Sequence, residues 1–257
     1  MTTQLRGGAT TDDPRLDRVP YWDEKNAEYP IRAILRTAEV PLAEKLWSQG
    51  VTTDQGREGA CVGHGCTQEA TASPDRVRIG PQWVYPHYKN DPSQFAQVVY
   101  KMAQKIDPWA GESYSGTAVL AGVQVLQTLG ILQEYRWAMS MDDLRDTLLY
   151  HGPVILGVNW YESMYDTAAN GLVDVSGSIV GGHCITVIGY DKSRRLLGMP
   201  KAEEMFRWKN SWGSDYGKSG TGWITAADLK RLVFDEGGEA CVPVTRKMPA
   251  LGQTLSL

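Results

Sequence analysis

The chain has 257 residues, an apolar fraction of 42% and a net charge of −4 at pH 7, so it is long enough to bury a sizeable core in one large domain or two lobes. Its charges are spread along the sequence, which excludes a basic footprint for nucleic acid or an anionic membrane. No stretch is apolar enough to span a membrane, and residues 1–18 lack the apolar core of a secretory signal.

The first part of the chain, residues 1–39, is a polar extension that prolines interrupt. Trp22 and Tyr29 are its candidate anchors to the rest of the protein. Two interpretations are open for this extension. It packs along the protein surface, as chain termini commonly do, or it is a short inhibitory pro-segment.

A glycine-rich stretch over residues 54–66 contains the cysteine on which most of the functional argument rests. Small and mildly apolar residues follow Cys61 and predict a helix that begins near it. At the first turn of a helix, unpaired N–H groups and the positive end of the dipole favour a thiolate, which is the form that attacks a carbonyl carbon. Gln55 lies six residues upstream across a glycine turn, so its amide can meet an oxyanion together with the Cys61 N–H.

The sequence up to residue 152 predicts further helices. They have apolar residues on one face and are expected around residues 83–88, 95–106, 117–129 and 140–152. Gly130 is the stop signal of the third, and Ser140, with an acidic residue three positions later, is the start signal of the fourth.

After residue 153 the pattern changes to short runs of β-branched and aromatic residues, which are typical of strands. These predicted strands cover residues 154–160, 183–189, 205–209 and 222–225. His183 begins one of them, and Asn210 directly follows another. Helices in the first half and antiparallel strands in the second predict an α+β protein of two packed units.

Three sequence blocks resemble the papain family of cysteine peptidases. Gln55 stands six residues before Cys61, small residues precede His183 and a Gly-Tyr pair follows it, and Asn210 lies within Lys-Asn-Ser-Trp-Gly. The blocks occur in the family's order of Gln, Cys, His and Asn, and the last is the most specific. The resemblance covers roughly residues 40–245, and it is to a short bacterial or phage-like form that lacks the family's long pro-region.

This resemblance implies a papain-like two-lobed fold. The nucleophile would lie on a helical lobe, and the histidine and asparagine on an antiparallel β-barrel lobe across a cleft. The chain is then expected to divide into an N-terminal extension, a mainly helical lobe, a β-rich lobe and a C-terminal tail, at residues 1–39, 40–152, 153–245 and 246–257. Residues 40–54 resemble the start of the family's mature chain, where a strand leads into the Gln55 turn.

The resemblance also implies a role for each polar residue. Cys61 is the predicted nucleophile, His183 the base, and Asn210 the residue that orients the imidazole by accepting its other N–H. Gln55 and the Cys61 N–H form the predicted oxyanion hole. Trp212 matches the tryptophan that shields the His–Asn contact from water. The Cys61–His183 pair is expected to rest as thiolate and imidazolium.

The other cysteines predict a reducing compartment and no metal site. Secreted members of the family usually carry a disulfide-bonded cysteine where this chain has Glu58, so we expect a cytoplasmic protein without a disulfide. Cys61 and Cys66 point to different sides of the helix and no CxxC pair exists, so they do not form a zinc site with His64. Cys66 and Cys184 are predicted core residues.

Two glycines and two substitutions affect the nucleophile helix. Gly63 and Gly65 are costly in a helix interior, at about 1 kcal/mol each, and therefore indicate close packing against a neighbour. Val62 replaces the family's usual tryptophan and Ala60 a small polar residue. These changes alter the expected shape of the cleft rather than its chemistry.

The sequence therefore predicts a papain-like cysteine endopeptidase that cleaves protein or peptide substrates through a Cys61 thioester, without a cofactor or metal. Two alternatives remain open. One is an acyl-transfer enzyme with the same triad, such as a transpeptidase or peptidoglycan amidase. The other is a non-catalytic structural protein of the same fold. The substrate, the route of activation and the oligomeric state are not predicted.

Overall fold

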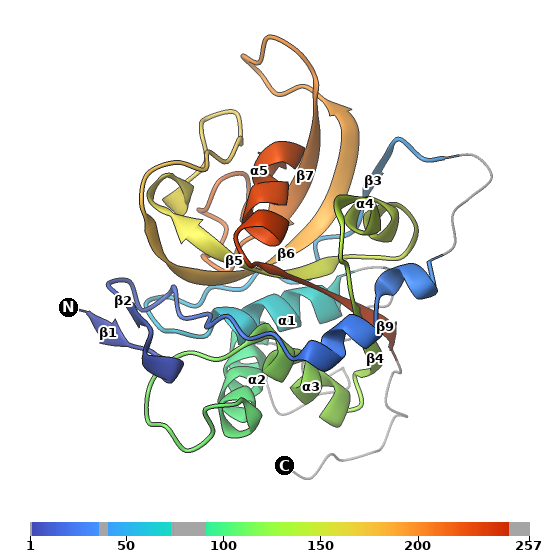
Figure 1. Ribbon diagram of the computed structural model, residues 1–257. Coiled ribbons are helices and arrows are strands. Elements are labelled where there is room, and N and C mark those ends of the chain that lie inside the picture. Colours follow the sequence, from blue (N-terminus) through green and yellow to red (C-terminus); the bar gives the residue numbers. More distant parts are fainter. Residues whose placement is uncertain (1, 36–40, 73, 75–90, 247–257) are drawn as a thin grey trace.

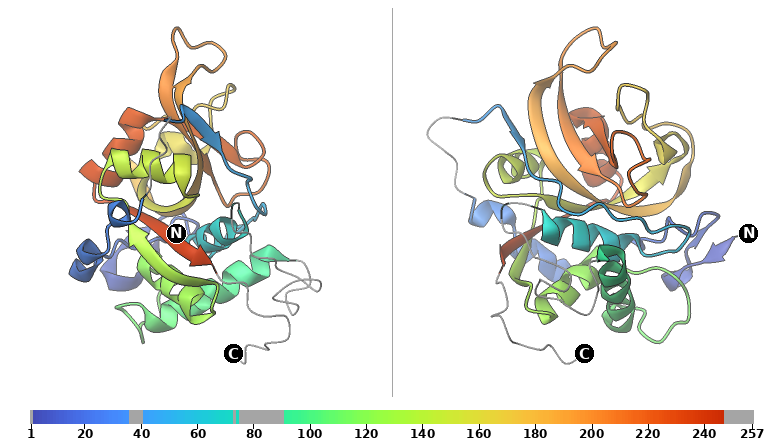
Figure 2. Two further views of the ribbon diagram at one scale, coloured as in Figure 1. Left: turned by 90° about the vertical axis from the view of Figure 1, so that its right-hand side faces the viewer. Right: turned by 180° about the vertical axis from the view of Figure 1, so that it is seen from behind.

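The computed structural model describes residues 2–35, 41–72, 74 and 91–246 of the chain. A helical part and a sheet part lie on either side of helix α1 (Cys61–Thr71), as Figures 1 and 2 show. Each part has its own hydrophobic core among the described residues. This arrangement agrees with the predicted α+β, two-lobed fold. The helical turn predicted around residues 83–88 lies outside the described residues.

The helical part contains α2 (Pro92–Ile106) and α3 (Val119–Thr128). Helix α2 begins where the Asp91 side chain accepts hydrogen bonds from two free backbone N–H groups, with proline in the first turn. Helix α3 starts two residues later than predicted because Thr117 has other partners. Its side chain donates to Asp107, and its carbonyl accepts from Val19. Gly130, at φ +70°, follows the end of α3.

Helix α1 is buried along its whole length, because it packs on both parts of the protein. A Cβ atom at Gly63 would lie 2.1 Å from the Ala96 carbonyl oxygen of α2. One at Gly65 would lie 2.6 Å from the Cys184 sulfur of the sheet. The predicted close packing of this helix is therefore confirmed, and so is the burial of Cys66 and Cys184.

The sheet part is an antiparallel sheet of seven strands in the described chain, in the order β4-β9-β5-β6-β7-β8, with β3 paired to β6. The strands are β3 (Glu44–Leu46), β4 (Leu132–Trp137), β5 (Val154–Tyr161), β6 (Ile179–Arg194), β7 (Glu203–Lys209), β8 (Thr221–Thr225) and β9 (Glu239–Arg246). Helices α4 (Met141–Tyr150) and α5 (Ala226–Lys230) pack on it. The short helical segments are η1 (Arg6–Gly8), η2 (Glu24–Glu28), η3 (Ile31–Ala33), η5 (Glu162–Tyr165) and η6 (Arg231–Asp235).

Several strands differ from the sequence prediction. Strands β4 and β9 were not predicted. The strand expected within residues 40–54 is β3, which covers only Glu44–Leu46. This strand pairs with β6. Residues 50–53 have other partners: the Val51 carbonyl accepts from the buried ammonium of Lys209, and the Thr53 carbonyl from the N–H of Gly213.

The N-terminal segment, residues 2–35, crosses between the sheet and the helices (blue in Figure 1). It begins with a small hairpin of β1 (Thr3–Gln4) and β2 (Thr10–Thr11). The run that follows is buried rather than superficial, because Leu16, Asp17, Arg18 and Val19 are at most 4% exposed. The interpretation as a surface extension is therefore wrong for this stretch.

Three arginines fix the N-terminal segment to the rest of the protein. Their carboxylate partners lie after α2, in β9 and in α4: Arg6 pairs with Asp107 at 3.3 Å, Arg18 with Glu239 at 2.8 Å and Arg32 with Asp143 at 2.7 Å. The two predicted anchor residues, Trp22 and Tyr29, are less buried than these ion pairs, since their side chains are 43% and 48% exposed. Among the described residues, no helix is long and apolar enough to cross a membrane.

Candidate active site

Cys61 is the first residue of α1, and its side chain is fully buried. The residue that covers it is Asp17 of the N-terminal segment. The Asp17 Oδ1 atom accepts a hydrogen bond from the Cys61 backbone N–H at 3.3 Å and from the thiol at 3.1 Å. Gly59 permits this approach, because a Cβ atom there would lie 2.5 Å from Asp17 Oδ2. The nucleophile position is thus occupied by the protein's own chain.

His183 lies on β6, the strand against which α1 packs. Its Nε2 atom lies 2.7 Å from Asn210 Oδ1, and the same oxygen accepts the backbone N–H of Ser211 at 2.7 Å. Because a backbone N–H only donates, the Asn210 atom facing the ring is its oxygen, so His183 Nε2 carries the proton. The other ring nitrogen, Nδ1, is then an acceptor, and it is buried without a hydrogen-bond partner in the described structure.

Two tryptophan rings lie against the His183 ring. The Trp212 ring lies 5.1 Å from the His183 ring, and the Trp160 ring 4.6 Å from it on an edge. Trp212 is thus in contact with the imidazole, and its shielding role stays a prediction. Trp160 was not singled out from the sequence, because an aromatic residue in a predicted strand usually belongs to the core.

Gln55 lies on a turn that begins with a backbone hydrogen bond from its N–H to the Ser211 carbonyl. Its side-chain oxygen accepts from the Ser211 hydroxyl at 2.6 Å, which fixes the orientation of the amide. The amide nitrogen donates to the carbonyls of Glu58, at 2.8 Å, and Arg15, at 3.2 Å. The second predicted oxyanion donor therefore also meets an oxygen atom of the N-terminal segment.

The surroundings of Cys61 and His183 shift both pKa values away from the expected ion pair. Burial, followed by the Asp17 carboxylate, raises the pKa of the Cys61 thiol well above its usual value. Burial lowers the pKa of His183 to about 4, against the opposite effect of its hydrogen bond to Asn210. In this conformation both shifts oppose the expected resting pair of thiolate and imidazolium.

The N-terminal segment also supplies the groups on either side of Asp17. Before it, the Arg15 guanidinium lies 4.2 Å from the centre of the Trp212 ring and pairs with Asp13 at 2.6 Å. After it, Arg18 extends into the protein to meet Glu239 of β9. None of these residues was predicted as part of the site. The one available signal was Leu16, an apolar residue within a polar run.

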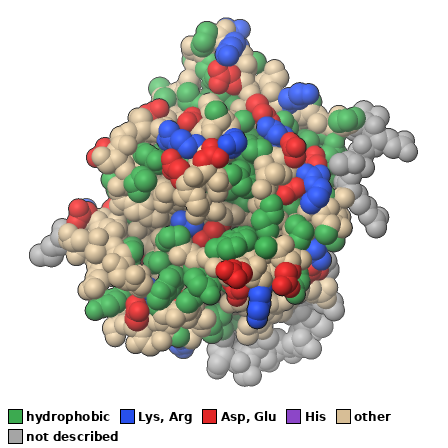
Figure 3. Space-filling view, in the orientation of Figure 1, with side chains coloured by type: hydrophobic (Ala, Val, Ile, Leu, Met, Phe, Trp, Pro, Cys, Tyr) green, Lys and Arg blue, Asp and Glu red, His purple; other side chains and the backbone are tan. Residues whose placement is uncertain are grey.

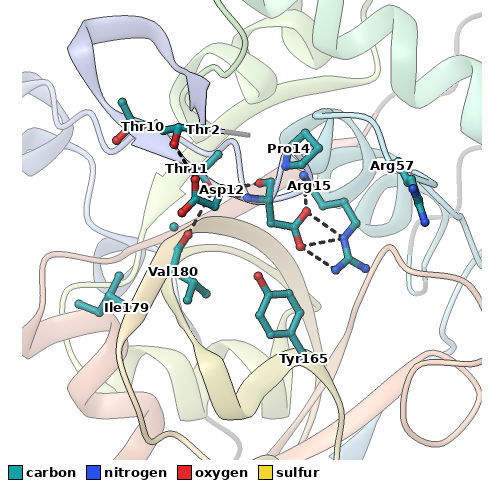
Figure 4. Close-up of a pocket in the computed structure, with 12 residues that line it drawn as sticks. Thr2, Thr10, Thr11, Asp12, Pro14, Arg15, Arg57, Tyr165, Ile179 and Val180 are labelled. Atoms are coloured by element: carbon teal, nitrogen blue, oxygen red, sulfur yellow. Dashed lines mark hydrogen bonds and ion pairs between the residues drawn. The ribbon is translucent and has the colours of Figure 1, made fainter.

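An open cavity of about 920 Å³ continues from this region, as Figure 4 shows. The segment residues Thr11, Pro14 and Arg15 line one side, and Tyr165 and Val180 of the sheet part line the other. The cleft is therefore filled beside Cys61 and open beyond Arg15.

The remaining candidate residues do not join the site. His64 is fully buried within α1, and burial lowers its pKa to about 4. All four cysteines are free thiols. No group of three or more His, Cys, Asp or Glu side chains in the described part of the chain is placed to hold a metal ion. Charges of both signs are interspersed on the face shown in Figure 3.

Comparisons with known proteins agree with this geometry. The family model described as papain family cysteine protease matches residues 102–232, just over half of the chain. The chain therefore belongs to the papain family of cysteine proteases. The matched region contains His183, Asn210 and Trp212 but not Gln55 or Cys61.

Two curated relatives are cathepsin B-like cysteine proteinases. The protein from Schistosoma japonicum is 36% identical over 76 residues, which is 30% of this chain and 20% of the relative. Cathepsin B-like cysteine proteinase 3 from Caenorhabditis elegans is 27% identical over 81 residues, 32% of this chain and 20% of the relative. The chain thus matches about a fifth of the length of these relatives.

Solved structures show the same fold. Xylellain, a cysteine protease from Xylella fastidiosa, has a TM-score of 0.60 at 16% identity and covers 92% of this chain and 98% of its own. The cysteine protease and lectin-like domains of Cwp84 from Clostridium difficile have a TM-score of 0.58 at 12% identity, with 94% and 63% covered.

Proposed function

We propose that this protein is a cysteine endopeptidase that hydrolyses peptide bonds of protein or peptide substrates. Cys61 attacks the carbonyl carbon, and its thiol proton passes to His183. His183 then protonates the leaving amine and activates the water that cleaves the thioester. Asn210 holds the imidazole in the required tautomer, and Gln55 with the Cys61 N–H stabilises the oxyanion.

The observation that carries this proposal is the position of two oxygen atoms of the N-terminal segment. The Cys61 N–H donates to Asp17 Oδ1 and the Gln55 amide donates to the Arg15 carbonyl. Donors that already bind oxygen atoms from an extended chain are suited to the developing negative oxygen of a bound peptide. The ring of His183, held by Asn210, supplies the base on the neighbouring strand.

We infer that the described conformation is the closed form of the enzyme. Substrate cannot reach a fully buried Cys61 while Asp17 covers it. The raised pKa of the thiol also opposes nucleophilic attack in this form. Release of residues 13–19 removes the Asp17 charge and admits water, and both changes favour the thiolate. The N-terminal segment therefore acts as a short inhibitory pro-segment.

The test combines labelling with an epoxysuccinyl thiol probe, peptide mapping and peptide hydrolysis. Cys61 is expected to be the labelled residue and Cys61→Ala to abolish hydrolysis, whereas Cys66→Ala serves as the control for loss of a buried thiol elsewhere in α1. Reaction in ¹⁸O-labelled water with an added amine separates hydrolysis from acyl transfer. A folded Cys61→Ala protein with wild-type activity would favour the structural alternative, and amide products alone would favour the transferase.

We further propose that the protein works in a reducing compartment such as the cytoplasm. Support comes from Glu58, which replaces the disulfide-forming cysteine of secreted members, and from the four free thiols. Fractionation of cells that produce the untagged chain tests this location.

A further inference from the structure

The side chain of Gln68 connects helix α1 to two other parts of the candidate active site. Gln68 lies seven residues after Cys61 on α1, which is close to two full helical turns, so the two side chains leave the same face of the helix. Its Nε2 atom donates to the Thr53 hydroxyl at 2.9 Å and to the Asn210 backbone carbonyl at 3.0 Å. One amide thus ties the helix that carries the nucleophile to Asn210 and to the turn that leads to Gln55.

The orientation of the Gln68 amide follows from its partners. A backbone carbonyl only accepts, so the Gln68 atom that faces Asn210 is the NH2 group and not the oxygen. Gln68, Thr53 and Asn210 are at most 1% exposed, so both hydrogen bonds are shielded from water. Removal of the amide would leave a buried carbonyl without this donor, which costs more than the loss of an exposed hydrogen bond.

The Thr53 end of this contact leads directly to the oxyanion turn. The Thr53 carbonyl accepts the N–H of Gly213 at 3.1 Å. Two residues later, the Gln55 N–H donates to the Ser211 carbonyl at 2.9 Å. Residues 53–55 and 211–213 therefore lie side by side, and Gln68 binds the first residue of one and the residue before the other. A shift of Thr53 relative to α1 therefore moves the Gln55 amide relative to the nucleophile.

In the closed form the N-terminal segment supplies a second connection between the same parts. Asp17 accepts the Cys61 N–H, and the Arg15 carbonyl accepts the Gln55 amide. Both contacts are lost when the segment leaves the cleft. The two hydrogen bonds of Gln68 involve no residue of the segment, so they are available to hold the site together in the open form.

We propose that Gln68 is a positioning residue that holds the Gln55 turn and Asn210 in place relative to Cys61 during catalysis. The inference rests on the proposed peptidase function. Gln68 takes part in no chemical step and acts through the groups that it holds. A displacement of a reacting group by about 1 Å costs about 10²-fold in rate, so the loss of this contact is expected to slow the reaction without removing it.

The experiment compares two reactions of Cys61 in the full chain. With p-nitrophenyl acetate, the thiolate sulfur bonds to the ester carbonyl carbon and p-nitrophenolate leaves, so the reaction passes through an oxyanion. With iodoacetamide, the sulfur displaces iodide and no oxyanion forms. Both reactions need a thiolate and an open cleft, so the ratio of the two rates measures stabilisation of the oxyanion. Release of p-nitrophenolate above the Cys61→Ala background gives the first rate, and peptide mapping gives the second.

The variants separate positioning from general loss of packing. Gln68→Met keeps the length of the side chain and removes the donor, and the ratio is expected to fall by about tenfold to a hundredfold. Thr67→Val is the matched control, because Thr67 is buried on the same helix but its hydroxyl donates to the Gly63 carbonyl, and it should keep the wild-type ratio. In Gln55→Ala/Gln68→Met the ratio should be about the same as in Gln55→Ala, since Gln68 acts on the oxyanion through Gln55.

A second pair of variants tests the same contact from its other end. Thr53→Ser keeps the hydroxyl and should keep the ratio, whereas Thr53→Val should lower it, and this pair decides if Gln68→Met does not fold. An equal ratio in folded Gln68→Met and Thr67→Val, or losses that add in the double variant, overturns the inference and leaves the peptidase proposal intact. Failure of p-nitrophenyl acetate to acylate Cys61 in the wild-type chain is a different result. It removes the proposed nucleophile, and the role of Gln68 with it.

Discussion

Leu16 offers the sharpest test of the closed form, because it fixes the segment immediately before Asp17. Its side chain is fully buried in the core of the sheet part, and a Cβ atom at Gly181 would lie 2.7 Å from its own Cβ. Replacement of a buried leucine by alanine costs about 2–5 kcal/mol. If that loss acts on docking of the segment, the open fraction of the protein rises roughly 30-fold to several-thousand-fold in Leu16→Ala.

The assay for Leu16→Ala is the rate at which iodoacetamide alkylates Cys61. Alkylation requires an open cleft, so the rate follows the open fraction while reclosing is fast. Ile34→Ala is the matched control, because Ile34 belongs to the same segment but is 37% exposed. Circular dichroism and thermal unfolding exclude general loss of structure. If a folded Leu16→Ala protein reacts no faster than Ile34→Ala, the segment does not hold the cleft closed through this contact.

Three further predictions concern chemistry at the site. Asn210→Ala should retain more turnover of a fluorogenic peptide than Cys61→Ala or His183→Ala, because it only orients the ring; an equal loss in all three would contradict this role. Gln55→Ala should lower turnover by about 10²–10³ through loss of one oxyanion donor, and unchanged turnover would remove it from the oxyanion hole. Intact mass after alkylation should be the same with and without reductant, since all four thiols are free.

His183 contacts Asn210, and Gln55 contacts the neighbouring Ser211, while Cys61 contacts Asp17. Short-range sequence patterns mark each of the residues with a predicted catalytic role. Cys61 follows a glycine turn and is the first residue of a helix. His183 lies within β6, four residues after its start, and Asn210 directly follows β7. Local spacing also placed Gln55 on the turn that meets Ser211. Their roles remain predictions, but their positions in the chain could be read from the sequence.

The contacts of the N-terminal segment could not be predicted from local sequence patterns. Arg18 and Glu239 are 221 positions apart, and neither lies in a run whose periodicity indicates its partner. Strand β9 contains Pro243, and proline argues against a strand within a sheet. Strand β4 has charged residues at alternate positions, so its sequence lacks an apolar run. The groups that oppose a thiolate were hidden for the same reason. Burial of Cys61 raises the pKa of its thiol first, and the Asp17 carboxylate, 44 positions away in the chain, raises it further.

Two buried groups at the cleft should respond to acid in opposite ways. Burial raises the pKa of Asp17 to about 6, above the ordinary value near 3.9, so the docked segment binds this proton more readily than the free one. Docking through Asp17 is therefore strengthened as pH falls through about 6 toward 4. Burial lowers the pKa of His183 to about 4, below the ordinary value near 6.5. Docking around His183 is therefore weakened as pH falls from about 6.5 toward 4.

Variants of these two residues should separate the opposing effects. In the wild-type protein, docking of the segment should change little between pH 6.5 and 4.5. The strengthening through Asp17 offsets the weakening around His183. In Asp17→Asn, His183 is the one of these two groups that still titrates, so lowering the pH should release the segment. In His183→Gln, Asp17 is the one that still titrates, so lowering the pH should strengthen docking of the segment. Hydrogen exchange of residues 13–19, referred to an unstructured peptide at each pH, measures the release. Identical pH profiles for the two variants would show that neither group links protonation to closure of the cleft.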